Sequence, residues 1–135
     1  MSRRESAPRI RLFPIPDEAV LVLRGDELEA EILRADAERF HRRFDEWGRY
    51  GVSAFVASEP EEVEVLCETR LQRFETVLIF RRSDLVEAGI EVVPTFRRPH
   101  VTLANADLDA LVKALLSCEH RALTNRHFER DERER

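Results

Sequence analysis

The feature that most constrains the fold is one long amphipathic helical pattern between about residues 27 and 49. Apolar residues recur there at steps of three and four, the spacing that places them along one face of an α-helix. Asp26, with Glu29 three residues later, can cap the first turn. Gly48 or Gly51 can end the helix. We therefore expect this helix to pack on a sheet through one apolar face, whose members are Leu28, Ile32, Leu33, Ala37, Phe40, Phe44 and Trp47.

Short apolar runs next to turn residues predict the strands of that sheet. Two further helices are expected, one after Ser58 and one capped by Asp107. Because the first three strands alternate with helices, they favour parallel neighbours, whereas the last two favour an antiparallel hairpin. The expected fold class is α+β, a single domain with a mixed sheet of about five strands and about three main helices packed on it. The predicted strands cover residues 19–25, 51–57, 74–80, 90–95 and 100–104.

The chain has 135 residues, which matches the usual size of one domain. Residues 1–18 contain three prolines and predict an extended arm, 19–124 are expected to form the domain, and 125–135 a charged tail. The two cysteines lack ligand-like neighbours, so we expect no metal site. No signal-peptide pattern and no apolar run of membrane-spanning length is visible, which predicts a cytoplasmic protein.

The charge of the chain limits the partners that it can bind. The net charge is −5 and the isoelectric point is about 5.5, which argues against non-specific nucleic-acid binding. Arginine binds phosphate and carboxylate groups through two parallel hydrogen bonds, so neighbouring arginines can hold an anion locally. Arg97 and Arg98 are the candidate anion-binding pair, and the alternative is that they are solvated strand ends.

A histidine and a threonine lie two residues apart in the last predicted strand. His100 and Thr102 therefore project from the same face. This His-x-Thr strand resembles one half of the 2H phosphoesterase motif, which implies an acid–base role for the histidine and a phosphate-holding role for the hydroxyl. The second half of that motif is missing from the chain, and the alternative is a strand that carries two polar residues. The nearby Arg97 and Arg98 should lower the pKa of His100.

A second constellation begins at the end of the first predicted strand. Arg24–Gly25, a long helix and then Ser53 on the next strand resemble the opening of ADP-ribosyltransferase-like domains, over residues 19–57. The resemblance implies that Arg24 holds a dinucleotide phosphate and that Ser53 braces the nicotinamide half. It also implies NAD as the co-substrate.

Two aromatic residues and one glutamate bear on this resemblance. Tyr50 and Phe55 could stack on a nicotinamide or adenine ring, and the alternative is packing in the core. The glutamate that such domains use is not identifiable, since Glu91 lies on a strand without the Glu-x-Glu or Gln-x-Glu pattern.

Two classes of function fit the sequence. The first is a small intracellular toxin-like enzyme, either ADP-ribosyltransferase-like or acting on RNA, as one member of a toxin–antitoxin pair. The second is a non-enzymatic protein-binding module of the partner or antitoxin type, whose acidic helix surfaces would meet a basic protein.

Overall fold

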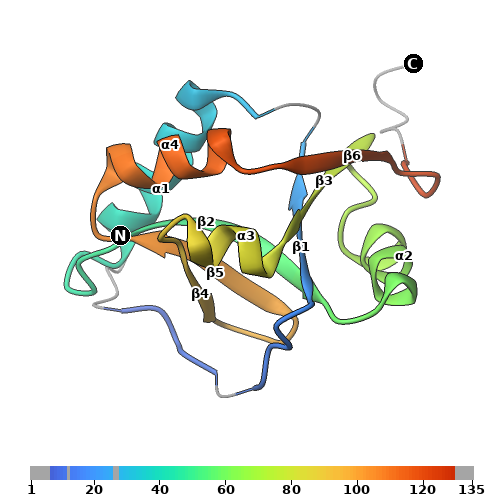
Figure 1. Cartoon of the computed structure of the whole chain (residues 1–135), viewed down its shortest axis with the longest axis horizontal. Helices are drawn as coiled ribbons and strands as arrows, with labels where there is room; N and C mark the ends of the chain where they lie inside the picture. Colours follow the sequence, from blue (N-terminus) through green and yellow to red (C-terminus); the bar gives the residue numbers. More distant parts are fainter. Residues whose placement is uncertain (1–6, 12, 26–27, 130–135) are drawn as a thin grey trace, which may run out of the picture.

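The computed structural model describes residues 7–11, 13–25 and 28–129. A single sheet runs through the domain, with α1 and α4 together on one side and α2 apart from the other helices (Figure 1). The elements are β1 (Val20–Arg24), α1 (Ala30–Arg43), β2 (Tyr50–Ala57), α2 (Pro60–Thr69), β3 (Thr76–Arg81), α3 (Arg82–Glu87), β4 (Glu91–Pro94), β5 (His100–Asn105), α4 (Leu108–Ser117) and β6 (His120–Thr124).

The sheet has six strands in the order β4-β5-β2-β1-β3-β6, and every strand pair in the described part of the chain is antiparallel. The expected α+β single domain is confirmed, whereas the expected parallel pairing of the first three strands is wrong. The reason is that β2 and β3 run in the same direction but flank β1 on opposite sides. The connection through α2 therefore carries the chain past β1, and the alternation of strands and helices does not reveal the strand in between.

The sixth strand, β6, is one that the sequence analysis does not predict. It pairs with β3 along its whole length, from Thr76 opposite Thr124 to Phe80 opposite His120. All five of its residues are exposed, so it has neither the apolar run nor the alternation from which a strand is inferred.

The larger of the two cores lies on the face of the sheet that α1, α3 and α4 cover. Strand residues that alternate along the sequence point into it, as Leu21 and Leu23 do from β1. The other face carries a smaller cluster around Val22, Val77 and Ile79, covered by Val63, Leu66 and Cys67 of α2. The fold therefore has two cores separated by one sheet. The members of the larger core are Ala19, Leu21, Leu23, Leu33, Ala37, Val52, Ala54, Val56, Leu78, Phe80, Leu85, Ile90, Val101, Leu103, Leu111, Val112, Ala114 and Leu115.

Helix α1 is shorter than expected and buries fewer residues. It begins at Ala30, and the predicted cap Asp26 lies outside the described residues. Leu33 and Phe44 are buried as predicted, but Ile32 is 54% exposed and Phe40 only partly buried. The apolar stripe of α1 is wide enough to face two neighbours. One edge packs into the larger core, and the other lines the cleft described below.

The N-terminal arm continues the edge of the sheet next to β4. Ile10 forms an isolated bridge with Thr95, and the amide of Arg11 donates to the carbonyl of Pro94 at 3.0 Å. The amide of Phe96 donates in turn to the carbonyl of Arg9 at 2.8 Å. Residues 9–11 therefore cover the end of the β4 edge.

The start of the predicted tail is also held by the domain. Asn125 is buried, and its side-chain amide donates to the carbonyls of Leu71 at 2.8 Å and Phe74 at 3.2 Å. The chain is therefore fixed up to the turn that follows β6, and residues 130–135 lie outside the described part. No helix in the described ranges is long and apolar enough to cross a membrane.

Candidate functional site

The main cleft of the molecule lies where β1 and β2 part. Their ladder ends at the pair Val22–Phe55, after which β1 continues along β3 and β2 continues along β5. The gap between the diverging strands is bounded by α1 and by the end of α2, and it encloses a volume of ≈ 980 Å³. Its lining residues are Val22, Leu23, Arg24, Gly25, Leu28, Glu29, Ile32, Leu33, Asp36, Arg39, Phe40, Arg43, Gly51, Val52, Ser53, Phe55, Arg70, Leu71, Phe74 and His100.

This cleft brings together four of the residues singled out from the sequence. Arg24 comes from the end of β1, Ser53 and Phe55 from β2, and His100 from the start of β5. Antiparallel pairing places Phe55 opposite His100, which brings the two constellations side by side. The candidate transferase residues and the candidate histidine therefore share one site.

A glycine allows α1 to approach this part of the sheet closely. A Cβ atom built at Gly51 would lie 2.5 Å from Cγ2 of Thr102 and 3.0 Å from Cδ1 of Phe40. Any larger residue at position 51 would collide with Thr102 and press on Phe40, so at least one of these side chains would have to move.

His100 is held by a short chain of hydroxyl groups. Its Nδ1 lies 2.9 Å from Oγ1 of Thr95, which in turn lies 2.7 Å from Oγ1 of Thr102. Both threonines are completely buried, and the His100 ring meets the ring of Phe55 edge-on at 5.6 Å between centroids. Since Nδ1 is engaged, Nε2 is the nitrogen that His100 can offer to a molecule in the cleft.

The pKa of His100 is lowered, in the direction expected from the sequence but with a different cause. Burial disfavours the charged imidazolium most, and Arg70 adds a smaller Coulombic contribution in the same direction. The backbone of Thr95 acts the other way and raises the pKa. The expected influence of Arg97 and Arg98 is not among these causes.

Thr102 is on the same strand face as His100 but does not line the cleft. Its side chain is fully buried between Thr95 and the position of Gly51. The hydroxyl therefore supports Thr95 and, through it, His100, rather than facing a ligand directly.

The arginines of the cleft differ in how they are paired. Asp36 of α1 accepts from Arg24 at 3.4 Å on one oxygen and from Arg39 at 3.1 Å on the other. Arg70 instead lies above the ring of Phe55, with its guanidinium carbon 5.9 Å from the ring centroid. The sequence analysis did not include Arg70, because nothing in the sequence near the end of α2 indicates which strand its side chain will reach.

The remaining predicted site residues lie outside the cleft lining. Tyr50 stacks on His41, with 4.2 Å between the ring centroids. Arg97 and Arg98 are exposed in the turn between β4 and β5, where the guanidinium of Arg98 lies 5.2 Å from the ring centroid of Phe13.

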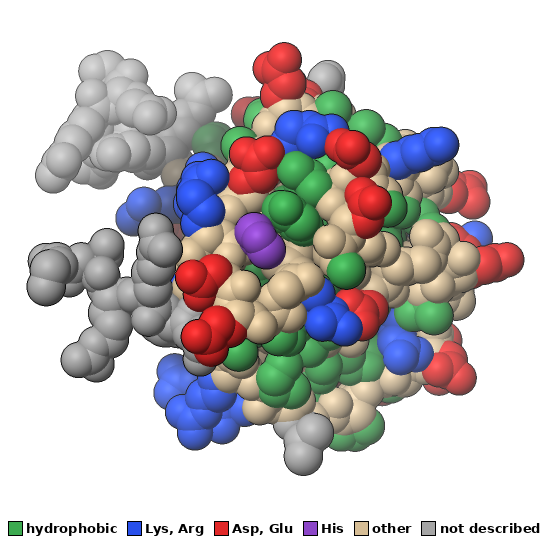
Figure 2. All heavy atoms as spheres, turned by 90° about the vertical axis from the view of Figure 1, so that its left-hand side faces the viewer, with side chains coloured by type: hydrophobic (Ala, Val, Ile, Leu, Met, Phe, Trp, Pro, Cys, Tyr) green, Lys and Arg blue, Asp and Glu red, His purple; other side chains and the backbone are tan. Residues whose placement is uncertain are grey.

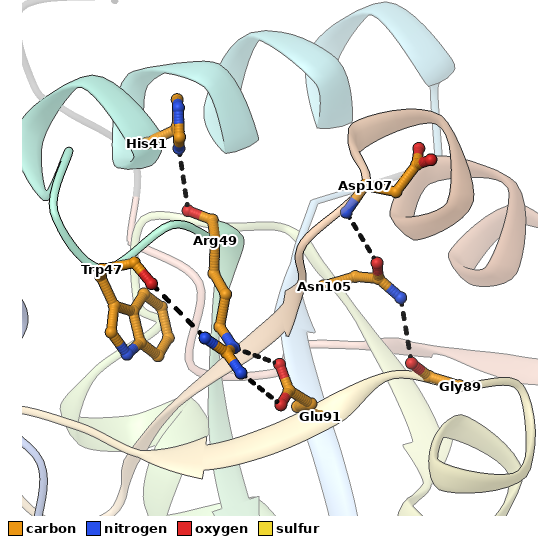
Figure 3. A network of polar contacts seen from close by, with 7 residues as sticks. All are labelled: His41, Trp47, Arg49, Gly89, Glu91, Asn105 and Asp107. Atoms are coloured by element: carbon orange, nitrogen blue, oxygen red, sulfur yellow. Dashed lines mark hydrogen bonds and ion pairs between the residues drawn. The ribbon is translucent and has the colours of Figure 1, made fainter.

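The carboxylate considered for the transferase constellation, Glu91, is engaged elsewhere. It forms a two-point ion pair with Arg49, at 2.5 Å to Nε and 3.1 Å to Nη2, and Arg49 also donates to the carbonyl of Trp47. Figure 3 shows this pair beside the contact from Asn105 to Gly89, in a network that ties the end of α1 to β4. The two acidic residues that line the cleft within the described ranges are Glu29 and Asp36.

No metal site is evident in the described part of the chain. It contains no group of three or more histidine, cysteine or acidic residues placed to hold a metal ion. The face drawn in Figure 2 has acidic and basic side chains interleaved around a hydrophobic area, without a continuous patch of one sign. No family model, curated protein or solved structure matches the chain. The cleft is therefore the basis for any functional argument.

Proposed function

We propose that the cleft binds an organic anion of nucleotide size and that the protein is an enzyme acting on it. The observation that carries this proposal is the convergence of Arg24, Ser53, Phe55 and His100 on one cavity of ≈ 980 Å³. A cavity of this size is at the upper end of the range of about 300–1,000 Å³ for small-molecule sites.

The lining suits both parts of a nucleotide. Three aromatic side chains, Phe40, Phe55 and Phe74, offer surfaces against which a flat base can lie. Four arginines and two acidic residues line the same space, so positive charge is in excess where a phosphate would bind. NAD, the co-substrate implied by the ADP-ribosyltransferase-like resemblance, combines these two chemical features.

The first experiment asks whether the cleft is the binding site. NAD and adenosine monophosphate should each raise the melting temperature of the wild type, because a ligand that binds only the native state stabilises it by about 2.7 kcal/mol at one hundred times its Kd. Ser53→Trp would fill the cleft from an exposed position on β2 and should abolish the shift. Ala122→Trp places the same bulk on the exposed strand β6 and should leave the shift intact. No shift with either ligand at millimolar concentration would refute the proposal.

The second experiment asks for chemistry on NAD. Glu29 lines the cleft without the two-arginine pairing of Asp36, so it is the carboxylate we assign to positioning the ribose. Nicotinamide release from NAD should fall by about a hundredfold or more in Glu29→Gln. Glu31→Gln changes an exposed glutamate two residues later, in the first turn of α1, that does not line the cleft, and its rate should match the wild type. Equal rates in the two variants would exclude this role for Glu29.

A protein-binding module is the second candidate, and the exposed strand β6 favours it. One edge of the sheet is partly covered by the N-terminal arm, whereas all five residues of β6 are exposed at the other edge. An exposed edge strand can accept a strand from a partner through main-chain hydrogen bonds. Light scattering of the purified protein over a range of concentrations would detect pairing between two copies, and Leu123→Pro should then reduce it.

A further inference from the structure

We infer that the anionic group of the ligand is held by Arg70 and His100 around the ring of Phe55, and not by Arg24. This inference rests on the proposed function and specifies which end of the cleft binds the anionic group of the ligand. We call Phe55, Arg70 and His100 together the Arg70 subsite.

The first step in the argument is the pairing of the arginines. Arg24 and Arg39 share the carboxylate of Asp36, so a ligand anion there would have to compete with a charge that the protein already supplies. Arg43 lies 4.7 Å from the ring centroid of Phe44 and has further interactions. Among the described residues, the side chain of Arg70 has no carboxylate partner and lies above the ring of Phe55.

The second step is the arrangement around Phe55. Arg70 lies above this ring at 5.9 Å, and His100 meets it edge-on at 5.6 Å. Both side chains line the cleft, and Arg70 is near enough to His100 to affect its protonation. A guanidinium and an imidazole thus flank one aromatic side chain, which the flat base of a nucleotide could also contact.

The third step is the ligand chemistry that fits these groups. A guanidinium offers parallel N–H donors that match two oxygens of a phosphate. His100 has Nε2 left for the ligand and donates a further hydrogen bond to an oxyanion when it is protonated. The chemical class is therefore a nucleotide phosphate, with the phosphate at the Arg70 subsite and adenosine monophosphate as the simplest probe of it.

Binding should also change the titration of His100. The charged groups that line the cleft around it are Arg70 from the end of α2, Arg24 from β1, and Glu29, Asp36, Arg39 and Arg43 from the α1 side. Burial and, less strongly, the charge of Arg70 disfavour the imidazolium in the empty cleft and lower the pKa of His100. A bound phosphate reverses this local balance, so the pKa of His100 should rise on binding.

The test compares two arginine variants with two ligands. Adenosine monophosphate and adenosine are titrated calorimetrically into the wild type, Arg70→Ala and Arg24→Ala. Arg70→Ala should weaken monophosphate binding by about tenfold or more, the effect of losing a charge-assisted hydrogen bond, and leave adenosine binding unchanged. Arg24→Ala should change monophosphate binding by less than about threefold, because Asp36 already pairs with that guanidinium.

The titration of His100 gives a second readout from the same proteins. By NMR, its pKa should rise when the monophosphate is added to the wild type, and should not rise when adenosine is added. A larger loss in Arg24→Ala than in Arg70→Ala, or a pKa unchanged by the monophosphate, would overturn the inference while leaving the proposed binding function in place. A wild type that binds neither compound would refute the proposed function itself.

Discussion

The two faces of the sheet differ in how completely helices cover them. Three helices bury the first face, where the alternating residues of the central strands are all apolar, as in Val52, Ala54 and Val56 of β2. On the second face, α2 covers β1 and β3, while over β2 and β5 the same alternation presents Ser53 and His100 to the cleft. The polar groups that could carry function therefore lie where the second core stops.

The largest expected effect tests whether the first face supplies most of the stability. Phe80 is fully buried in the larger core, so Phe80→Ala should lower the free energy of unfolding by about 3–5 kcal/mol. Urea denaturation measures this value. An effect below that of Leu66→Ala would reverse the ranking of the two cores.

A somewhat smaller effect is expected on the second face. Leu66 of α2 is buried in the smaller cluster, and Leu66→Ala should cost about 2–3 kcal/mol, because this cluster has fewer neighbours to lose. Val65→Ala, at an exposed position on the same helix, is the matched control and should cost about 0.5 kcal/mol or less. Similar losses for the two variants would mean that α2 contributes little to folding.

The hydroxyl chain beside the cleft can be tested by removing its central hydroxyl. Thr95→Val keeps the shape of the side chain but leaves His100 Nδ1 and the buried Thr102 hydroxyl without their partner. We expect a loss of about 1–2 kcal/mol in stability, together with a shift of the His100 ring signals in the NMR spectrum. Unchanged ring signals would show that Thr95 does not orient the histidine.

The smallest expected effect is a pH dependence that His100 introduces. The pKa of His100 is lower in the folded than in the unfolded state, so unfolding takes up a proton below about pH 6.5. The free energy of unfolding therefore decreases as the pH is lowered below that value. The stability that depends on neutral His100 is fully present above its unfolded pKa. It amounts to about 1.4 kcal/mol for each unit by which the folded pKa lies below the unfolded one. His100→Gln should flatten the stability profile below about pH 6.5, where the wild type loses stability as the pH falls. A slope unchanged by His100→Gln would contradict the lowered pKa.

Much of the fold could be predicted because periodicity reports burial. Helix α1 and the five strands with apolar runs were found in this way, and β6 was missed because none of its residues is buried. The burial of Ile32 was predicted wrongly. A helical spacing of apolar residues does not distinguish a residue that faces a core from one that faces a cleft, and Ile32 faces the cleft. Strand direction depends on which strands become neighbours, and no local pattern encodes that choice.

The site was less predictable than the fold, for a related reason. Arg24, Ser53 and His100 were each noticed, but their convergence depends on the register that sets Phe55 opposite His100. Arg70 was missed because its place in the cleft depends on the tertiary contact with the ring of Phe55, which no local pattern of the sequence indicates.

The short ladder between β1 and β2 makes the sheet mechanically uneven. Three residue pairs, Val20–Ala57, Leu21–Val56 and Val22–Phe55, join the two halves of the sheet, whereas six pairs join β2 to β5 and five join β1 to β3. A force that pulls the halves apart should therefore open this seam before any other line in the sheet between β5 and β3. Because the cleft begins where the seam ends, its width depends on the spacing of β1 and β2, and widening it would strain the larger core, which contains residues of both strands.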